Sequence, residues 1–189
     1  MDLEKKKNEK KELNAKNDVI FKELFSKKGN EDLLIDLLSN ILGEKITKID
    51  ITKDVSLNRD VYGEKYGILD IGAEIDGKKY VDIEMQVAED HYLLERLEYY
   101  ASKRISHDLE SGHGYNELRE VIEIALVDYI MFPDLKTAMH KSLRVLNEDR
   151  NYELKSLHKE IIVEMPKMSS ERKWYKWRTY EVADFSKPW

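Results

Sequence analysis

The sequence predicts an α/β domain in which helices flank a mixed β-sheet, and three observations support this fold class. Residues 67–87 alternate apolar and polar side chains in two runs, as half-buried strands do. Residues 91–112 carry apolar side chains at helical spacing, and residues 121–130 form an apolar run typical of an inner strand. The order helix, helix, strand, strand, strand, long helix, strand is that of an α/β domain, for which 189 residues suffice.

The chain divides into a leader and one domain. Residues 1–16 are charged and lack apolar periodicity, so we expect a mobile leader followed by a single domain over 17–189. The elements expected in that domain are a helix over 17–25 capped by Asn17 or Asp18, a helix over 32–42 ended by Gly43, a strand over 45–52, a hairpin over 67–87, a long helix from His91 to about Gly112, a strand over 121–130, two later strands over 138–146 and 158–165, and a terminal helix over 169–180.

The hairpin turn Asp76-Gly77-Lys78 fixes how its two strands pair. A two-residue loop would place apolar residues opposite polar ones, whereas a three-residue loop with Gly77 in the left-handed conformation pairs Ile75 with Lys79. That register places Ile71 opposite Ile83, so that the apolar face is consistent. It also places Asp70 opposite Glu84, where two like charges are destabilising.

Two opposed carboxylates favour a cation between them. Magnesium is typically bound by one or two carboxylates together with waters and a substrate phosphate. The alternative is a solvent-exposed face with scattered acids, which suits Glu74, Asp76 and Asp82. The register alone leaves these two interpretations open.

Composition limits the function classes. The absence of cysteine excludes disulfides, thiolate nucleophiles and cysteine-ligated zinc, and the absence of a long apolar run predicts a cytoplasmic protein without a membrane span. The net charge of −6 argues mildly against nucleic-acid binding, yet residues 1–28 carry nine Lys against six acids, and residues 167–189 carry six Lys and Arg against three acids. An acidic centre with basic ends suits a metal site flanked by phosphate contacts, and it equally suits an ordinary solvated surface.

Several segments resemble one protein family in order and spacing. Asp70 followed by Glu84-Met85-Gln86 resembles the PD-(D/E)XK nuclease motif, with glutamine in the place of its lysine. The segments NDVIFKELF, LDIGAEIDG, VDIEMQV, ERLEYYASKRISHDLESGHGYNEL and MPKMSSERKW extend the resemblance over about residues 17–185. Together they resemble the recombination-promoting nuclease (Rpn) and transposase family of the PD-(D/E)XK superfamily, whose members usually carry glutamine at the place of Gln86.

The resemblance implies a restriction-endonuclease-like core and a metal-dependent DNA endonuclease of recombination or mobile elements. Asp70, Glu84 and the Met85 carbonyl would bind Mg²⁺ or Mn²⁺, and Gln86 would complete the catalytic set by hydrogen bonding only. Many members carry a helical C-terminal extension, and whether this chain lacks it stays open. Assembly into a homo-oligomer stays open, as does the alternative of a catalytically inactive DNA-binding or protein-interaction module on the same fold.

A basic group is expected to compensate for the missing lysine. Arg96, Tyr99 or Tyr100, and Lys103 lie three and four residues apart on the long helix and are expected to form a polar stripe opposite its leucine stripe, where Arg96, Tyr100 and Lys103 could contact DNA. A solvated helix face is the alternative. Lys22 is a further candidate phosphate contact and Asp18 a candidate accessory acid, although a surface charge and a helix cap explain them equally well.

Overall fold

The computed structural model describes residues 18–52, 56–57, 67–68, 71–109 and 114–168. Its elements in chain order are α1 (Asp18–Ser26), α2 (Glu31–Leu42), β1 (Ile49–Thr52), β2 (Ser56–Leu57), β3 (Gly67–Ile68), β4 (Ile71–Ile75), β5 (Lys79–Gln86), α3 (Leu93–His107), the 3-10 turn η1 (Tyr115–Glu117), β6 (Glu120–Val127), β7 (Met139–Lys141), β8 (His158–Glu164) and the 3-10 turn η2 (Met165–Lys167). The terminal helix expected over 169–180 lies outside the described residues.

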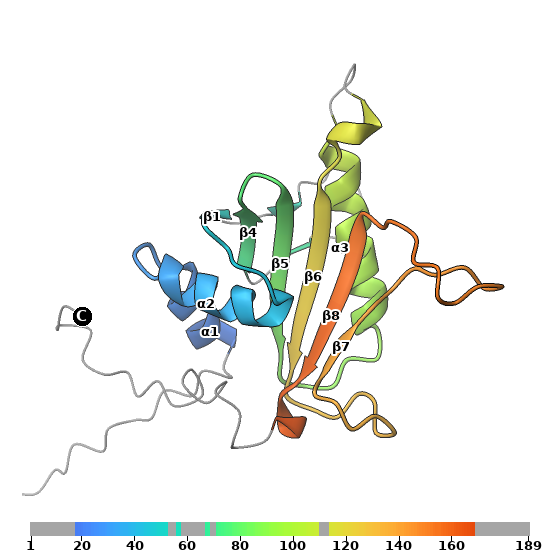
Figure 1. The fold of residues 1–189 in the computed structure, drawn as a ribbon. Coiled ribbons are helices and arrows are strands. Elements are labelled where there is room, and N and C mark those ends of the chain that lie inside the picture. Colours follow the sequence, from blue (N-terminus) through green and yellow to red (C-terminus); the bar gives the residue numbers. More distant parts are fainter. Residues whose placement is uncertain (1–17, 53–55, 58–66, 69–70, 110–113, 169–189) are drawn as a thin grey trace, which may run out of the picture.

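Six strands form one mixed sheet in the order β1-β4-β5-β6-β8-β7, and β2 pairs with β3 in a separate two-stranded sheet. The pairs β5–β6 and β6–β8 are parallel and the remaining pairs of the large sheet are antiparallel. The apolar strand β6 therefore lies inside the sheet with parallel neighbours on both sides, as its sequence predicts. This arrangement confirms the α/β fold class (Figure 1).

The hairpin register also agrees with the prediction. Ile75 pairs with Lys79 and Ile71 with Ile83. Gly77 adopts φ +66°, and the Lys78 N–H donates to the Ile75 carbonyl at 2.9 Å. Before β4, Ile68 of β3 pairs with Ser56 of β2.

The two faces of the sheet carry different cores. The larger core joins α1 and α2 to the side chains of Val81, Ile83 and Met85 on β5. The smaller core joins Leu93 and Leu97 of α3 to the opposite face, which carries residues such as Ala125, Val127 and Ile162. In Figure 1, α3 accordingly runs behind the sheet, on the side away from α1 and α2.

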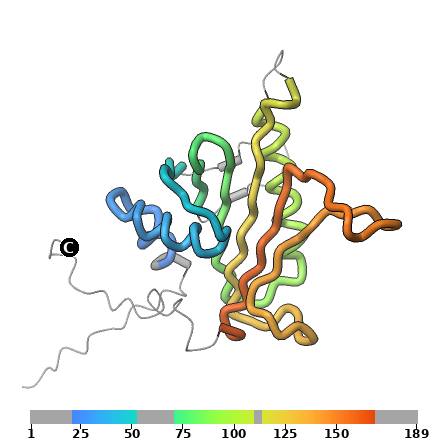
Figure 2. Tube along the Cα trace, in the orientation of Figure 1, coloured from blue at the N-terminus to red at the C-terminus, as the bar shows by residue number. Residues whose placement is uncertain are grey.

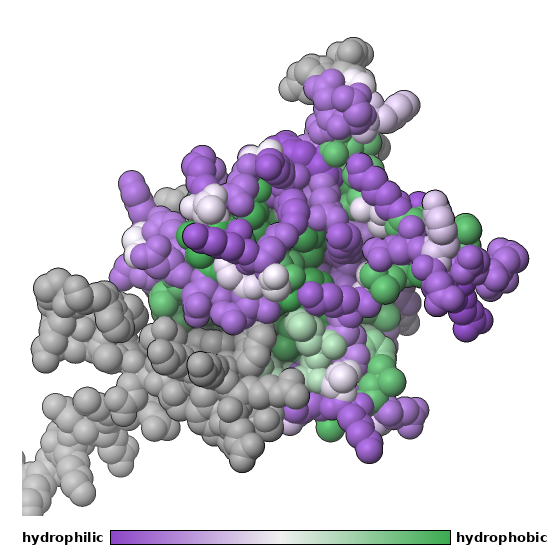
Figure 3. All heavy atoms as spheres, in the orientation of Figure 1, coloured by the Kyte–Doolittle hydropathy of each residue, from purple (hydrophilic) through white to green (hydrophobic). Residues whose placement is uncertain are grey.

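The connection between β7 and β8 extends away from the body of the molecule (Figure 2). An isolated bridge between Val145 and Glu153 joins its two limbs, and Tyr152 is 59% exposed. The described surface in the view of Figure 3 is mainly hydrophilic, with apolar residues in scattered places. None of the helices in the described part of the chain is long and apolar enough to cross a membrane.

Candidate active site

The period of β5 decides which side chains reach α3. Val81, Ile83 and Met85 point into the larger core, so Asp82 and Glu84 point to the opposite face, which α3 covers. Because α3 lies over this face, the carboxylates of β5 are not on an open surface. Glu84 is 17% exposed and Asp82 is 1% exposed.

Asp70, the second predicted ligand, lies outside the described residues. The neighbouring pair Ile71–Ile83 has the register from which the opposition of Asp70 and Glu84 was predicted, and β4 and β5 are antiparallel. The opposition itself stays a prediction. The Met85 side chain lies in the larger core, so that only its backbone carbonyl could serve as a ligand.

One guanidinium gathers the polar groups at the end of β5. Arg96, in the first turns of α3, bonds the Glu84 Oε1 atom through its Nη2 atom, and the same nitrogen donates to the Gln86 Oε1 atom at 3.0 Å. Its Nη1 atom donates to the Asp90 Oδ2 atom at 2.7 Å. Arg96, a predicted DNA contact, therefore bonds two predicted catalytic residues, Glu84 and Gln86.

The Gln86 amide is held at both ends. Its oxygen accepts from Arg96, and its nitrogen donates to the Ala88 carbonyl at 2.7 Å. The side chain thus links the guanidinium to the turn that leaves β5. The catalytic role expected for Gln86 stays a prediction.

The expected polar stripe on α3 does not lie opposite the leucine stripe. Lys103 is only 8% exposed, while Arg96 and Tyr100 are half-buried beside the buried Leu97. The reason is geometric: these positions flank the leucine stripe on the helical wheel, and a broad sheet covers both. Tyr99, by contrast, is 40% exposed.

Tyr100 lies in the same electrostatic environment as Glu84. Burial raises the pKa of the Tyr100 hydroxyl, the Arg96 charge opposes this rise, and the charges of Glu84 and Glu123 add to it. The hydroxyl is therefore neutral at physiological pH and can donate a hydrogen bond.

Lys22 and Asp18 belong to the other side of the sheet. Both lie on α1, whose Phe21 and Phe25 pack in the larger core. Asp18 is the first residue of the helix, and its side chain lies outside the described part of the structure. Phosphate or metal contacts by these two residues stay predictions.

Two further acids are buried under α3. Asp82 pairs in register with Glu123 on β6, and both residues are buried. Burial raises the pKa of Asp82 to about 6, against the lowering effect of Arg104, whose Nη2 atom lies 3.9 Å from the Asp82 Oδ1 atom. Burial, with the charges of Asp82 and Glu84, raises the pKa of Glu123 well above its usual range.

The exposed-face interpretation of Asp82 is therefore wrong, because α3 covers the face to which this residue points. Glu74 is half-buried and accepts from the Arg119 Nη1 atom at 3.0 Å. Asp76 accepts from the Thr47 hydroxyl at 2.7 Å and from the Lys48 N–H at 2.8 Å. Glu74 therefore links β4 to Arg119, and Asp76 links the hairpin turn to the segment before β1.

Sequence reasoning missed Asp90, Arg104 and Glu123. A single acid inside the most apolar strand was a usable signal for Glu123, and the spacing of Arg104 seven residues after Leu97 placed it on the inner side of α3. No comparable signal existed for Asp90, because its contact depends on how the loop before α3 closes.

The described residues include some, but not all, of the predicted metal ligands. Among them, no three His, Cys, Asp or Glu side chains are grouped so that they could hold a metal ion. The described donors are the Glu84 carboxylate and the Met85 carbonyl, which are hard oxygen ligands of the kind that Mg²⁺ prefers. The donor chemistry fits a divalent cation, and Asp70 would supply the second carboxylate.

A comparison of the chain with known proteins identifies one matching family. The model of a PD-(D/E)XK nuclease family transposase matches residues 15–181. Neither the curated proteins nor the solved structures contain a significant match.

Proposed function

Because the chain belongs to the PD-(D/E)XK nuclease family transposases, we propose that it is a metal-dependent DNA endonuclease acting in recombination or mobile-element biology. The observation that carries this proposal is the convergence of Glu84 and Gln86 on the Arg96 guanidinium at the end of β5. Glu84 and Gln86 occupy the two motif positions that follow Asp70 in the family resemblance. The reaction would be hydrolysis of a phosphodiester bond.

The proposed metal ligands are Asp70, Glu84 and the Met85 carbonyl. A Mg²⁺ or Mn²⁺ ion held there would act as a Lewis acid on the scissile phosphate and would activate water. Glu84 is suited to this role because it is largely buried yet retains access to solvent, with 17% of its side chain exposed.

Arg96 is the best candidate for the positive charge that the motif lysine would supply. Its guanidinium contacts both motif side chains, and arginine side chains carry a positive charge. It can therefore stabilise negative charge on a phosphate but cannot act as a general base. Gln86 would keep the guanidinium in place, and Tyr100 would support the same end of the site. Lys103, about two helical turns further along α3, would lie away from the Arg96 end.

Plasmid nicking tests the proposal. Supercoiled plasmid is incubated with the protein in Mg²⁺, in Mn²⁺ and in EDTA, and nicked product is expected only with metal. Glu84→Gln should lower the cleavage rate by at least about 10²-fold, the scale of losing one transition-state contact. The matched control is Glu95→Gln, an exposed acid on α3, which should cleave at the wild-type rate.

The same assay separates two ways of replacing the lysine. Arg96→Met should slow single-turnover cleavage at saturating DNA, whereas Lys103→Ala should do so only if Lys103 provides the charge. Metal-independent nicking that survives Glu84→Gln would contradict the proposal.

One observation supports the alternative of an inactive DNA-binding module: the proposed metal-binding carboxylate of Glu84 is paired with the Arg96 guanidinium. Wild-type protein that binds duplex DNA but never nicks it in Mg²⁺ or Mn²⁺ would favour this second function.

A further inference from the structure

Arg96 contacts the carboxylate that a divalent cation at the proposed site would use. Its guanidinium bonds the Glu84 Oε1 atom and, at 3.0 Å, the Gln86 Oε1 atom. The Arg96 side chain is 29% exposed and Glu84 is 17% exposed, so that solvent screens the pair only in part. A cation on the Glu84 carboxylate would share that carboxylate with a second positive charge.

The surroundings explain why a protein cation is needed here. Glu84 follows Asp82 on the same face of β5, and Glu123 lies opposite Asp82 on β6. Three acids therefore lie under α3, and Glu84 is the one that Arg96 neutralises. In the absence of metal, Arg96 makes the burial of Glu84 tolerable.

The other end of the guanidinium has a separate anchor. Asp90 accepts from the Arg96 Nη1 atom at 2.7 Å and from the Tyr92 N–H at 2.9 Å. Asp90 is thus fixed to the start of α3. Arg96 can leave Glu84 and still keep one charged partner close to the site.

We propose, on the basis of the proposed nuclease function, that Arg96 and the divalent cation compete for Glu84, so that metal binding releases the guanidinium to contact a DNA phosphate. In the metal-free protein, Arg96 neutralises the charge of the Glu84 carboxylate. Metal and DNA then bind with positive coupling, and each raises the affinity for the other by the same factor.

Mn²⁺ titration by calorimetry without DNA tests the competition directly. Arg96→Met removes the competing charge and should raise the Mn²⁺ affinity by on the order of tenfold, within the usual range of coupling between sites. Arg104→Met is the matched control, because Arg104 lies on the same helix face but pairs with Asp82. Its Mn²⁺ affinity should stay within about twofold of wild type, since it does not occupy Glu84.

Thermal denaturation provides a readout independent of activity. In EDTA, Arg96→Met should melt below wild type because Glu84 has lost its counter-ion, and saturating Mn²⁺ should raise its melting temperature more than that of wild type. Arg96→Gln should behave similarly and keeps the test available if the methionine variant fails to fold. With Ca²⁺ in place of Mn²⁺, the metal-dependent gain in DNA affinity should be smaller in the Arg96 variants than in wild type.

The outcomes separate this inference from the proposed function. Mn²⁺ affinity that is unchanged or weaker in both Arg96 variants would overturn the competition, while wild-type metal binding and nicking would still support the nuclease. An absence of Mn²⁺ binding in every variant, wild type included, would overturn both.

Discussion

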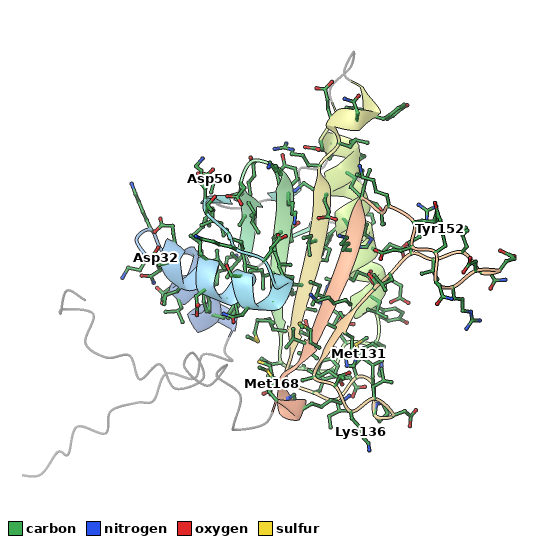
Figure 4. The ribbon with its side chains drawn as sticks, viewed as in Figure 1. Asp32, Asp50, Met131, Lys136, Tyr152 and Met168 are labelled. Atoms are coloured by element: carbon green, nitrogen blue, oxygen red, sulfur yellow. The ribbon has the colours of Figure 1, made fainter. Side chains whose placement is uncertain are left out.

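Glu164 and Glu123 are buried carboxylates on adjacent parallel strands, yet they differ in their hydrogen bonds and in the direction of their pKa shifts. Glu164, at the end of β8, is 0% exposed and accepts from four donors: the Met131 and Phe132 N–H groups, the Lys167 ammonium and the His140 ring. Glu123, in the middle of β6, is 1% exposed, and its Oε1 atom has no hydrogen-bond partner among the described residues. Figure 4 labels Met131 and Met168 near the end of the sheet where β8 terminates.

The difference appears in the protonation of the two groups. Burial alone would raise the pKa of Glu164, but hydrogen bonds from Lys167, Phe132, His140 and Met131 lower it below its usual value. Burial and the neighbouring acids raise the pKa of Glu123 well above its usual range. A carboxylate that is fully bonded holds the structure together as an anion. Glu123, whose Oε1 atom has no hydrogen-bond partner in the described part of the chain, instead has a raised pKa beside the candidate site.

The largest expected effect is the loss of the bonded carboxylate. Glu164→Ala should lower the free energy of unfolding by about 3–5 kcal/mol, because it leaves two backbone N–H groups without an acceptor and removes the carboxylate partner of Lys167, which keeps only the Phe132 carbonyl. Urea denaturation at pH 7.5 measures this loss. The control Glu153→Ala, an exposed acid on the β7–β8 connection, should change the free energy by no more than about 0.5 kcal/mol.

The same acid predicts a pH dependence. The pKa of Glu164 is lower in the folded state than in the unfolded state. Its contribution to the free energy of unfolding is therefore present above the unfolded-state pKa and is lost as the pH falls through the folded-state pKa. The difference between wild type and Glu164→Gln should therefore shrink under acid conditions. A difference that stays constant from pH 7 to pH 3 would show that the charge of Glu164 does not stabilise the fold.

Glu123 should respond in the opposite direction. Its folded pKa is raised, so its stabilising contribution is present below the unfolded pKa and is lost as the pH rises. The permanently neutral Glu123→Gln should therefore raise the free energy of unfolding at pH 8 by about 1–3 kcal/mol, the cost of a buried unsatisfied group.

The gain in the free energy of unfolding from Glu123→Gln should disappear near pH 4, where wild-type Glu123 is itself neutral. The matched control is Glu120→Gln on the same strand, which loses bridges to Lys79 and Lys159 and should not stabilise the protein. A destabilised Glu123→Gln at pH 8 would mean that this acid is held as an anion like Glu164.

The contrast also explains what the sequence could predict. The hairpin register was predictable because its turn chemistry is local: Gly77 adopts the left-handed φ that the three-residue loop requires. The inner position of β6 was predictable from its apolar run, and alternation correctly placed Asp82 and Glu84 on one face. These features depend on residues that are close together in the chain.

The burial of that face was not predictable in the same way. Whether Asp82 is exposed depends on α3, and the apolar stripe of α3 does not show that the sheet also covers Arg96 and Lys103 beside it. The donors around Glu164 come from residues up to 33 positions away, since Met131 and Glu164 meet only after β6 and β8 pair. Contacts between distant segments determine both carboxylate environments.

The smallest expected effect concerns how Arg104 limits the rise in the pKa of Asp82. Burial raises the pKa of Asp82 to about 6, and the Arg104 charge 3.9 Å away opposes the rise. Arg104→Met removes this opposing charge, so the Asp82 pKa should move above 6, as a ¹³C NMR titration of the aspartate carboxyls would show. Arg144→Met, an exposed arginine on the β7–β8 connection, is the matched control and should leave the titration unchanged. A lower Asp82 pKa in Arg104→Met would mean that water enters when the guanidinium is removed, and that Arg104 and α3 raise this pKa by keeping the site dry.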